Sequence, residues 1–170
     1  MPVAEPTATP AAFRAPMRSR DDSVPAGAAV ERALTAGLCG VGGRLSTAPA
    51  TLEAAIRAAD ATHGERLARR LERFTAVPDG AFVWTRDADD VFWLGRLARP
   101  WRYDADPAAA AVDLVHVRPC WWLPAPIDEA DVPAEVRASF SRGGRNWQTI
   151  RAPGAAPATA ALWVARLTPG

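Results

Sequence analysis

The sequence predicts an α+β fold in which a small bent β-sheet or barrel is flanked by helices. Segments with helical periodicity come first, at residues 25–36, 52–60 and 64–75. From residue 81 onward the chain contains short strand-like segments, and the series closes on a strand at 112–118 that runs into two tryptophans. Helices followed by a run of strands are typical of the α+β class. A compact series of short strands favours a curved sheet.

The chain begins with a segment of low complexity. Residues 1–20 are dominated by Pro, Ala and Thr, which cannot bury enough apolar surface to order a chain. We therefore expect residues 1–20 to form a flexible tail and residues 21–168 to form a single domain. The arginines at 14, 18 and 20 either contact an anionic partner or are simply solvated.

The composition excludes several classes of function. All 20 basic residues are arginine, and the absence of lysine excludes a P-loop and any nuclease centre that requires a lysine. The net charge of +1 provides no strong overall field toward nucleic acid or membranes. We expect no metal or cofactor, because Cys39 and Cys120 have no metal-ligand spacing and are predicted to be buried free thiols. With no signal peptide and no apolar run of about 20 residues, the expected location is cytoplasmic, without membrane contact.

The three helices have recognisable ends. Pro25 suits the opening turn of the first helix and Gly37 its C-terminal end. Thr51 is a natural N-cap for the second helix. The third, at 64–75, has one apolar face, and its mixed charges on the other face predict a solvated surface.

A glycine-rich strand lies between the first two helices, at residues 38–45. Its glycines, Gly40, Gly42 and Gly43, do not form the GxGxxG pattern of a dinucleotide site. Glycines within a strand often mark a place where a ligand or another backbone comes close. A bulge or turn without any ligand is the alternative.

The second half of the chain is predicted to begin with a hairpin. Its strands are residues 81–86 and 91–98, joined by a turn at 87–90. A loop at 99–111 then carries two aromatic residues, Trp101 and Tyr103.

The strand at 112–118 is followed by Pro119, which cannot donate a ladder hydrogen bond. The strand is therefore expected to end there, to be bulged, or to lie at a sheet edge. Alternation places Arg118, Cys120 and Trp122 on one face. An arginine beside tryptophans favours a binding site, although core packing is an equally simple role for Trp122.

The C-terminal part contains a basic, glycine-bearing segment at residues 141–150, between a short helical turn predicted at 133–140 and a final helix predicted at 157–167. Arg142 and Arg145 flank two glycines, and Trp147 follows them. These residues either grip a nucleic-acid backbone or form a solvated turn whose tryptophan closes the end of a barrel.

The order of these motifs resembles a known superfamily. Gly-Val-Gly is followed by a helical pair and by Pro-Asp-Gly-Ala-Phe-Val-Trp, and then by Phe-Trp-Leu-Gly-Arg-Leu, Trp-x-Tyr, His-Val-Arg-Pro-Cys-Trp-Trp-Leu and Asp-Val-Pro. The series is similar to the PUA-like EVE/YTH superfamily, especially the prokaryotic EVE-like domains associated with restriction systems. The resemblance covers roughly residues 21–150.

The resemblance implies a non-catalytic reader that binds DNA or RNA and holds a flipped, modified base in an aromatic pocket. The context implied is restriction–modification or RNA modification, with a separate nuclease subunit as a further partner. Trp101 matches a cage tryptophan of YTH-type relatives, whereas Gly43 and Arg44 stand where those relatives carry another aromatic residue. The base is then a different one, or other tryptophans complete the pocket. The residues expected to contact nucleic acid are Gly42, Arg44, Trp84, Trp101, Tyr103, Arg118, Trp122, Arg142, Arg145 and Trp147.

Two other functions remain open from the sequence. The near-neutral charge favours a protein-interaction domain, because nucleic-acid binders usually carry a broad basic surface. An ASCH-like hydrolase would use Arg118 with Asp113 or Asp104. No pair of carboxylates and no nucleophile spacing supports that chemistry, so an enzyme is not expected.

Overall fold

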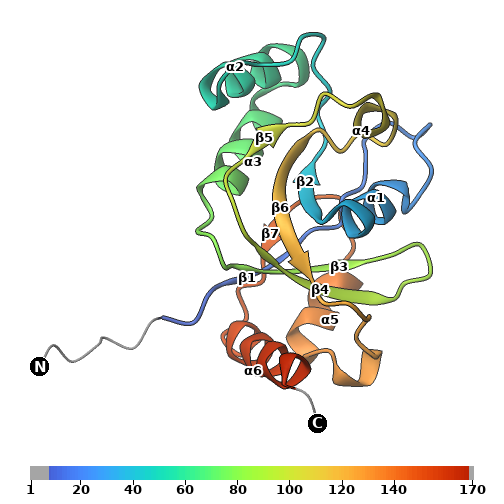
Figure 1. The fold of residues 1–170 in the computed structure, drawn as a ribbon, viewed down its shortest axis with the longest axis vertical. Coiled ribbons are helices and arrows are strands. Elements are labelled where there is room, and N and C mark those ends of the chain that lie inside the picture. Colours follow the sequence, from blue (N-terminus) through green and yellow to red (C-terminus); the bar gives the residue numbers. More distant parts are fainter. Residues whose placement is uncertain (1–7, 169–170) are drawn as a thin grey trace, which may run out of the picture.

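The computed structural model describes residues 8–168, which form an α+β fold with a curled, mixed β-sheet (Figure 1). The strands are β1 (Ala12–Arg14), β2 (Leu38–Val41), β3 (Phe82–Arg86), β4 (Phe92–Leu97), β5 (Arg102–Tyr103), β6 (His116–Trp122) and β7 (Gln148–Thr149). The helices are α1 (Ala28–Ala36), α2 (Leu52–His63), α3 (Glu65–Ala76), α4 (Pro107–Ala111), α5 (Ala134–Ser141) and α6 (Ala155–Leu167), with a short 3₁₀ turn at Glu129–Asp131. The predicted fold class is thereby confirmed.

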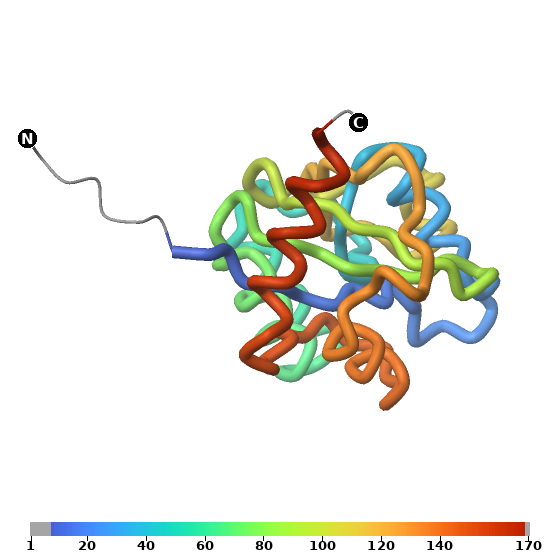
Figure 2. The backbone as a smooth tube through the Cα atoms, turned by 90° about the horizontal axis from the view of Figure 1, so that it is seen from below, coloured from blue at the N-terminus to red at the C-terminus, as the bar shows by residue number. Residues whose placement is uncertain are grey.

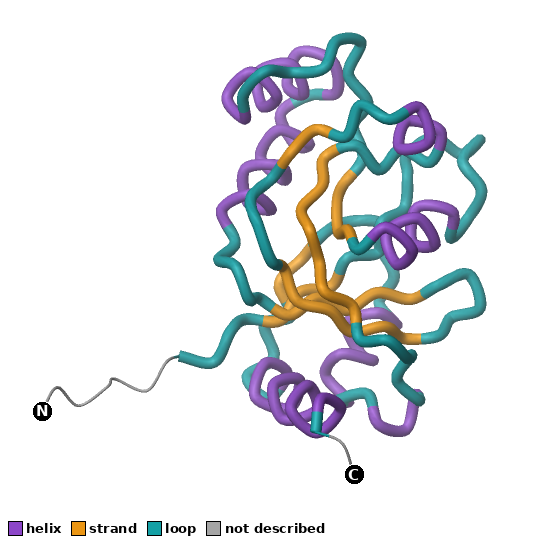
Figure 3. The backbone as a smooth tube through the Cα atoms, viewed as in Figure 1, coloured by secondary structure: helices purple, strands orange, loops and turns teal. Residues whose placement is uncertain are grey.

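The sheet is organised around β6, the strand with the most partners. The strand order is β2-β6-β4-β3-β1-β7, and β5 pairs with β6 beside this path. The first half of β6 pairs with β2 and β5, and its second half pairs with β4. Figure 3 shows the strands curling as the sheet passes from β2 and β6 to β3 and β4.

Two apolar cores lie on opposite faces of the sheet. One core packs α1, α2 and α3 against β2, β6 and the residues that follow β1. The other packs α5 and α6 against β3 and β4, with Trp84 fully buried at its centre. Figure 1 shows α5 and α6 below β3 and β4, with α1 to α4 above these two strands, on the side of β2, β5 and β6, and Figure 2 shows α6 crossing the strands.

The predicted helices are confirmed, although α1 begins at Ala28, after Pro25, and α2 continues to His63. Thr51 is the N-cap of α2, and its hydroxyl accepts a hydrogen bond from the Ala54 N–H at 3.1 Å. Gly37 ends α1 in the left-handed conformation, which glycine adopts without strain. Both cysteines are buried free thiols, as predicted. None of the helices in the described part of the chain is long and apolar enough to cross a membrane.

The predicted flexible tail is wrong for residues 8–20 and lies outside the described residues for 1–7. Residues 12–14 form β1, which pairs in parallel with β3 and antiparallel with β7. Phe13, Ala15 and Met17 are buried in the first core. Although the segment is rich in Pro and Ala, its backbone pairs with a strand on each side and its alternate apolar side chains enter the core, so the sheet supplies the order that local composition lacks.

The chain around β6 also differs from the prediction. The expected loop at 99–111 contains β5 and α4, whose N-cap Asp106 accepts a hydrogen bond from the Ala108 N–H. The strand begins at His116 and continues through Pro119 to Trp122. The missing N–H of Pro119 is tolerated because it lies where β6 changes partner from β5 to β4. Arg118 and Cys120 are buried, whereas Trp121 is 70% exposed.

Candidate functional site

A cleft of about 370 Å³ lies where β2 continues into the glycine-rich segment. Residues 15–21, which follow β1, form one wall, and residues 40–44 form another. The 63–70 stretch, from the end of α2 into α3, and residues 145–147 complete it, and Asp113 contributes a carboxylate. We call it the Asp113 cleft.

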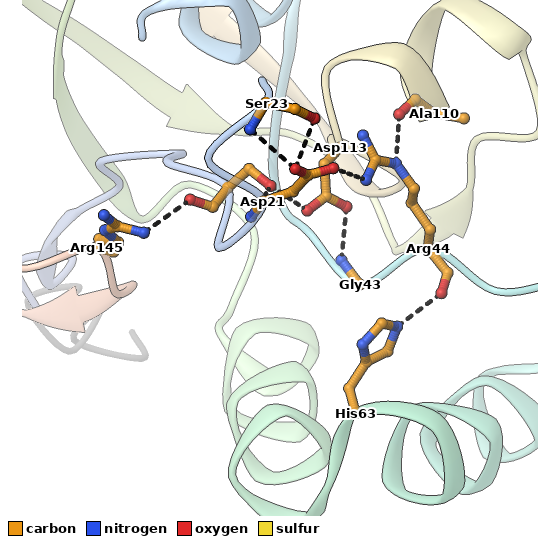
Figure 4. A network of polar contacts seen from close by, with 9 residues as sticks. Asp21, Ser23, Gly43, Arg44, His63, Ala110, Asp113 and Arg145 are labelled. Atoms are coloured by element: carbon orange, nitrogen blue, oxygen red, sulfur yellow. Dashed lines mark hydrogen bonds and ion pairs between the residues drawn. The ribbon is translucent and has the colours of Figure 1, made fainter. Parts of the chain in front are cut away.

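Asp113 joins two walls of this cleft. One of its carboxylate oxygens accepts a hydrogen bond from the Ser19 hydroxyl at 2.6 Å, and the other accepts from the Gly43 N–H at 2.9 Å (Figure 4). Its backbone has a φ of +52°, which is costly for a non-glycine residue and is held by these contacts. A Cβ atom on Gly42 would lie 2.7 Å from the Asp113 carboxylate. The glycine at 42 is therefore required by the approach of Asp113, not by a ligand.

The second carboxylate of the cleft, Asp21, is paired with an arginine. It lies 2.9 Å from an Nη of Arg44, whose Nε donates to the Ala110 carbonyl at 2.6 Å. Hydrogen bonds from Ser23, together with Arg44, lower the pKa of Asp21 to about 2. A nitrogen of His63 lies 2.7 Å from the Arg44 carbonyl (Figure 4). Asp21 therefore stays ionised and holds Arg44 in place.

The remaining arginines of the cleft have few anionic partners. Five arginines and two aspartates line it, and Arg44 takes the charge of one aspartate. Within residues 8–168, Arg18, Arg20 and Arg70 form no ion pair, and the buried Nε of Arg70 has no hydrogen-bond partner. Burial lowers the pKa of the Arg70 guanidinium, as do the nearby charges of Arg20 and Arg73. The cleft thus holds excess positive charge.

A buried histidine supports the glycine wall from behind. His116 is fully buried, and its Nε2 lies 3.0 Å from the Gly43 carbonyl. Burial lowers the pKa of His116 to about 4, so the ring is neutral at pH 7. The Trp101 indole N–H lies 3.4 Å from Nδ1, which must then accept, so Nε2 carries the proton and donates to Gly43.

The structure brings four of the ten sequence-predicted site residues to this cleft, namely Gly42, Arg44, Arg145 and Trp147. Arg145 reaches it from the loop before β7 and lies 3.3 Å from Asp22. Trp147 is only 5% exposed, and its ring stacks on Phe13 with centroids 4.7 Å apart. The expectation of an open stacking platform is therefore wrong for Trp147, whose ring fills the core beneath the cleft.

Two other predicted site residues are structural. Trp84 has no exposed surface, and its indole N–H donates to Thr159 at 3.0 Å. Arg118 is 1% exposed and pairs with Asp79 at 2.8 Å. The predicted contacts of Trp84 and Arg118 with a ligand are wrong, because burial removes both side chains from the surface. Since Arg118 pairs with Asp79, it does not serve the hydrolase arrangement with Asp104 or Asp113.

The three remaining aromatic candidates, Trp101, Tyr103 and Trp122, lie outside the Asp113 cleft. Trp101 and Tyr103 both pack on the His116 ring, and the Tyr103 hydroxyl accepts from the Leu45 N–H at 3.0 Å. Trp122 is half-buried and donates to the Leu38 carbonyl at 2.9 Å. These three residues are not among those that line the Asp113 cleft. Arg142 lies on a second cleft, described below.

Sequence reasoning missed most of the charged lining. Arg18 and Arg20 were assigned to the tail, and Arg70 to a solvated helix face. A clue was present in the apolar residues that alternate with Arg14 and Arg18, because alternation at positions 13, 15 and 17 is the pattern of a strand with one buried face. The contribution of Asp113 depends on a left-handed backbone, for which we find no signal in the sequence.

Comparison of the chain with models of protein families, with curated proteins and with solved structures finds no match.

Proposed function

We propose that the chain binds nucleic acid without catalysis and holds one unstacked nucleotide in the Asp113 cleft. The observation that carries the proposal is the excess of arginine in a cleft whose two aspartates are already engaged. A phosphate group matches the planar donor fork of an arginine and would neutralise this charge.

The size and lining of the cleft suit a base. About 370 Å³ lies near the lower end of the range for small-molecule pockets. Met17, Val41 and Leu67 provide apolar contact, and apolar walls replace the stacking that a flipped base gives up. The Asp113 carboxylate accepts hydrogen bonds and would suit an exocyclic amino group.

The resemblance to EVE/YTH domains supports the same function and adds that the base is modified, in DNA or RNA. The structure changes the residues proposed for the pocket. Arginine and aspartate side chains with a partly aliphatic wall take the place of the expected tryptophan cage.

The proposal is tested by calorimetric titration with a nucleoside 5′-monophosphate and with the matching nucleoside. We expect tighter binding of the monophosphate. Replacement of Arg20 and Arg70 by glutamine should remove that difference, because both guanidinium groups line the cleft. Equal binding of both compounds to the native protein, unchanged in the double variant, would contradict the proposal.

The matched control is Arg69→Gln with Arg166→Gln. Both arginines are exposed and paired with nearby carboxylates, and neither is among the residues that line the cleft. Exposed ion pairs contribute little to stability, so this variant keeps the fold and changes the net charge by the same amount.

A further inference from the structure

A second basic cleft, of about 720 Å³, lies beside β7 and shares Trp147 with the Asp113 cleft. Four arginines and one glutamate line it. The arginines come from β1, α3, the end of α5 and the segment after β7, and they are Arg14, Arg73, Arg142 and Arg151. We call it the Arg14 cleft.

Arg14 is a buried cation that has no anionic partner among residues 8–168. It is 5% exposed, and its guanidinium donates to the carbonyls of Ser139 and Gly143 at 2.5 and 2.7 Å and to the Gln148 side chain at 2.9 Å. All three acceptors are neutral. The Nε atom of Arg14 is buried and has no hydrogen-bond partner in the part of the chain that the structure describes. A buried charge without a countercharge is unfavourable, so this site favours an incoming anion.

Two neighbours of Arg14 strengthen this conclusion. The charge of Arg142 lies close enough to lower the pKa of Arg14, together with burial. The Ser139 hydroxyl, on the same cleft, is a buried polar group with no partner within residues 8–168. The Arg14 cleft therefore holds the hydroxyl of Ser139 as a free donor beside the positive charges of Arg14 and Arg142.

Arginines on α3 connect the two clefts. Arg70 lines the Asp113 cleft and Arg73 lines the Arg14 cleft. Three residues on a helix rise about 4.5 Å, so these side chains are neighbours. Their mutual repulsion contributes to the lowered pKa of Arg70. Positive charge thus continues from Arg20 through Arg70 to Arg73.

The loop between α5 and β7 separates the clefts, and its glycines serve this packing. Gly143 and Gly144 have φ angles of +72° and +106°, and a Cβ atom on Gly144 would lie 2.7 Å from a nitrogen of Arg14. These glycines let the loop pack against Arg14, which leaves Arg142 and Arg145 exposed on its two sides.

We propose that the Arg14 cleft binds the phosphodiester backbone of the same strand whose nucleotide occupies the Asp113 cleft. This inference rests on the proposed function and extends it: the ligand is a single strand with several phosphates, not a free nucleotide. The neighbouring positive charges of Arg70 and Arg73 on α3 suit a ligand whose negative charges are evenly spaced, such as a phosphodiester strand.

The experiment measures fluorescence anisotropy with a labelled single-stranded 12-mer, as DNA and as RNA, and calorimetry with a nucleoside 5′-monophosphate. In the Arg73→Gln/Arg142→Gln variant we expect affinity for the 12-mer to fall about tenfold at low salt. The slope of log affinity against log salt should decrease by about 1.4, because two fewer phosphates release counterions. Binding of the monophosphate should not change.

The variants separate the two proposals. Arg20→Gln/Arg70→Gln should weaken both ligands, and Arg69→Gln/Arg166→Gln should weaken neither. Native affinity for the 12-mer in the Arg73/Arg142 variant, with loss in the Arg20/Arg70 variant, would overturn the inference and leave the proposed function standing. Absence of binding to every ligand by the native protein would overturn both. Of the four arginines replaced in the two clefts, Arg20, Arg73 and Arg142 are exposed and Arg70 is half-buried. Equal melting temperatures confirm that the variants are folded.

Discussion

Two buried arginines, Arg118 and Arg14, lie in different chemical surroundings. The Arg118 guanidinium donates to the carbonyls of Phe74, Val77 and Arg99 and pairs with Asp79. Every one of its nitrogens has a partner, and two of those partners are carbonyls at the end of α3, which the helix itself cannot satisfy. Among the described residues, Arg14 has only neutral acceptors and no partner for its Nε, and it lies near Arg142.

The comparison shows how to separate a structural arginine from one suited to a ligand. Burial alone does not decide, because both side chains are at most 5% exposed. The decisive difference is whether the charge and all donors are satisfied within the protein. Arg118 meets that condition and Arg14 does not. Replacing each by methionine, which keeps much of the volume, tests the distinction.

The largest effect is expected for Arg118→Met. The change leaves three buried or partly buried carbonyls without their donor and Asp79 without its partner, which should lower the free energy of unfolding by about 3–5 kcal/mol. Urea denaturation at pH 7 measures it. A stable variant that had lost only nucleic-acid binding would instead make Arg118 a ligand residue.

His116 should make stability depend on pH by a similar amount. Its pKa is about 4 in the folded protein and about 6.5 when unfolded, so the unfolded chain binds more protons between these values. Stability is therefore fully present above pH 6.5 and is lost as the pH falls toward 4, by about 3 kcal/mol in total. Two nearby titratable groups also act on the pKa of His116: the charge of Asp113 raises it, and that of His63 lowers it.

Urea denaturation of the native protein and His116→Gln at pH 7.5 and pH 4.5 checks this. The glutamine amide can still donate to the Gly43 carbonyl but does not titrate, so the variant should lose less stability over that interval. The lowered pKa values of Asp21 and Asp104 act below pH 3.8 and do not interfere. Parallel losses in the two proteins would contradict a neutral His116.

Arg14→Met should have a smaller effect on stability than Arg118→Met, about 1–3 kcal/mol. Three hydrogen bonds to neutral acceptors are lost, but an unpaired buried charge and its repulsion with Arg142 disappear as well. The measurement is urea denaturation combined with anisotropy of the 12-mer, for which affinity should fall. A stability loss equal to that of Arg118→Met would remove the distinction between the two arginines.

The smallest effect is expected for Trp101→Phe, which removes the N–H that faces His116 but keeps most of the ring. We expect a loss of about 1 kcal/mol in unfolding free energy and no change in oligonucleotide affinity. Selective loss of binding in a stable variant would return Trp101 to the pocket predicted from the resemblance.

Local sequence signals predicted the elements well and the site poorly, for a physical reason. Thr51 and Gly37 end helices through their own backbone and side-chain chemistry, so their roles are readable from neighbours in the chain. The Asp113 cleft is made by contacts such as Ser19 with Asp113, which lie 94 residues apart. Spacing within a motif carries no information on such a pair.

Overall charge was equally uninformative. The chain carries a net charge of +1, yet nine of its 20 arginines line the two clefts, against only three of the acidic residues that the structure describes. This gathering of arginines in the clefts depends on β1, which places Arg14 between β3 and β7. A segment expected to be a tail thus contributes residues to both clefts.

The most direct test of the account uses the tryptophan indole N–H signals in a ¹H–¹⁵N NMR spectrum, assigned by single Trp→Phe variants. Trp147 lines both clefts, whereas Trp163 belongs to α6 and packs in the second core beside Phe82. We predict that addition of the single-stranded 12-mer shifts the Trp147 signal and leaves that of Trp163 in place. Trp93 and Trp121 are not among the residues that line either cleft, so a shift confined to them, with Trp147 unchanged, would contradict binding at these clefts.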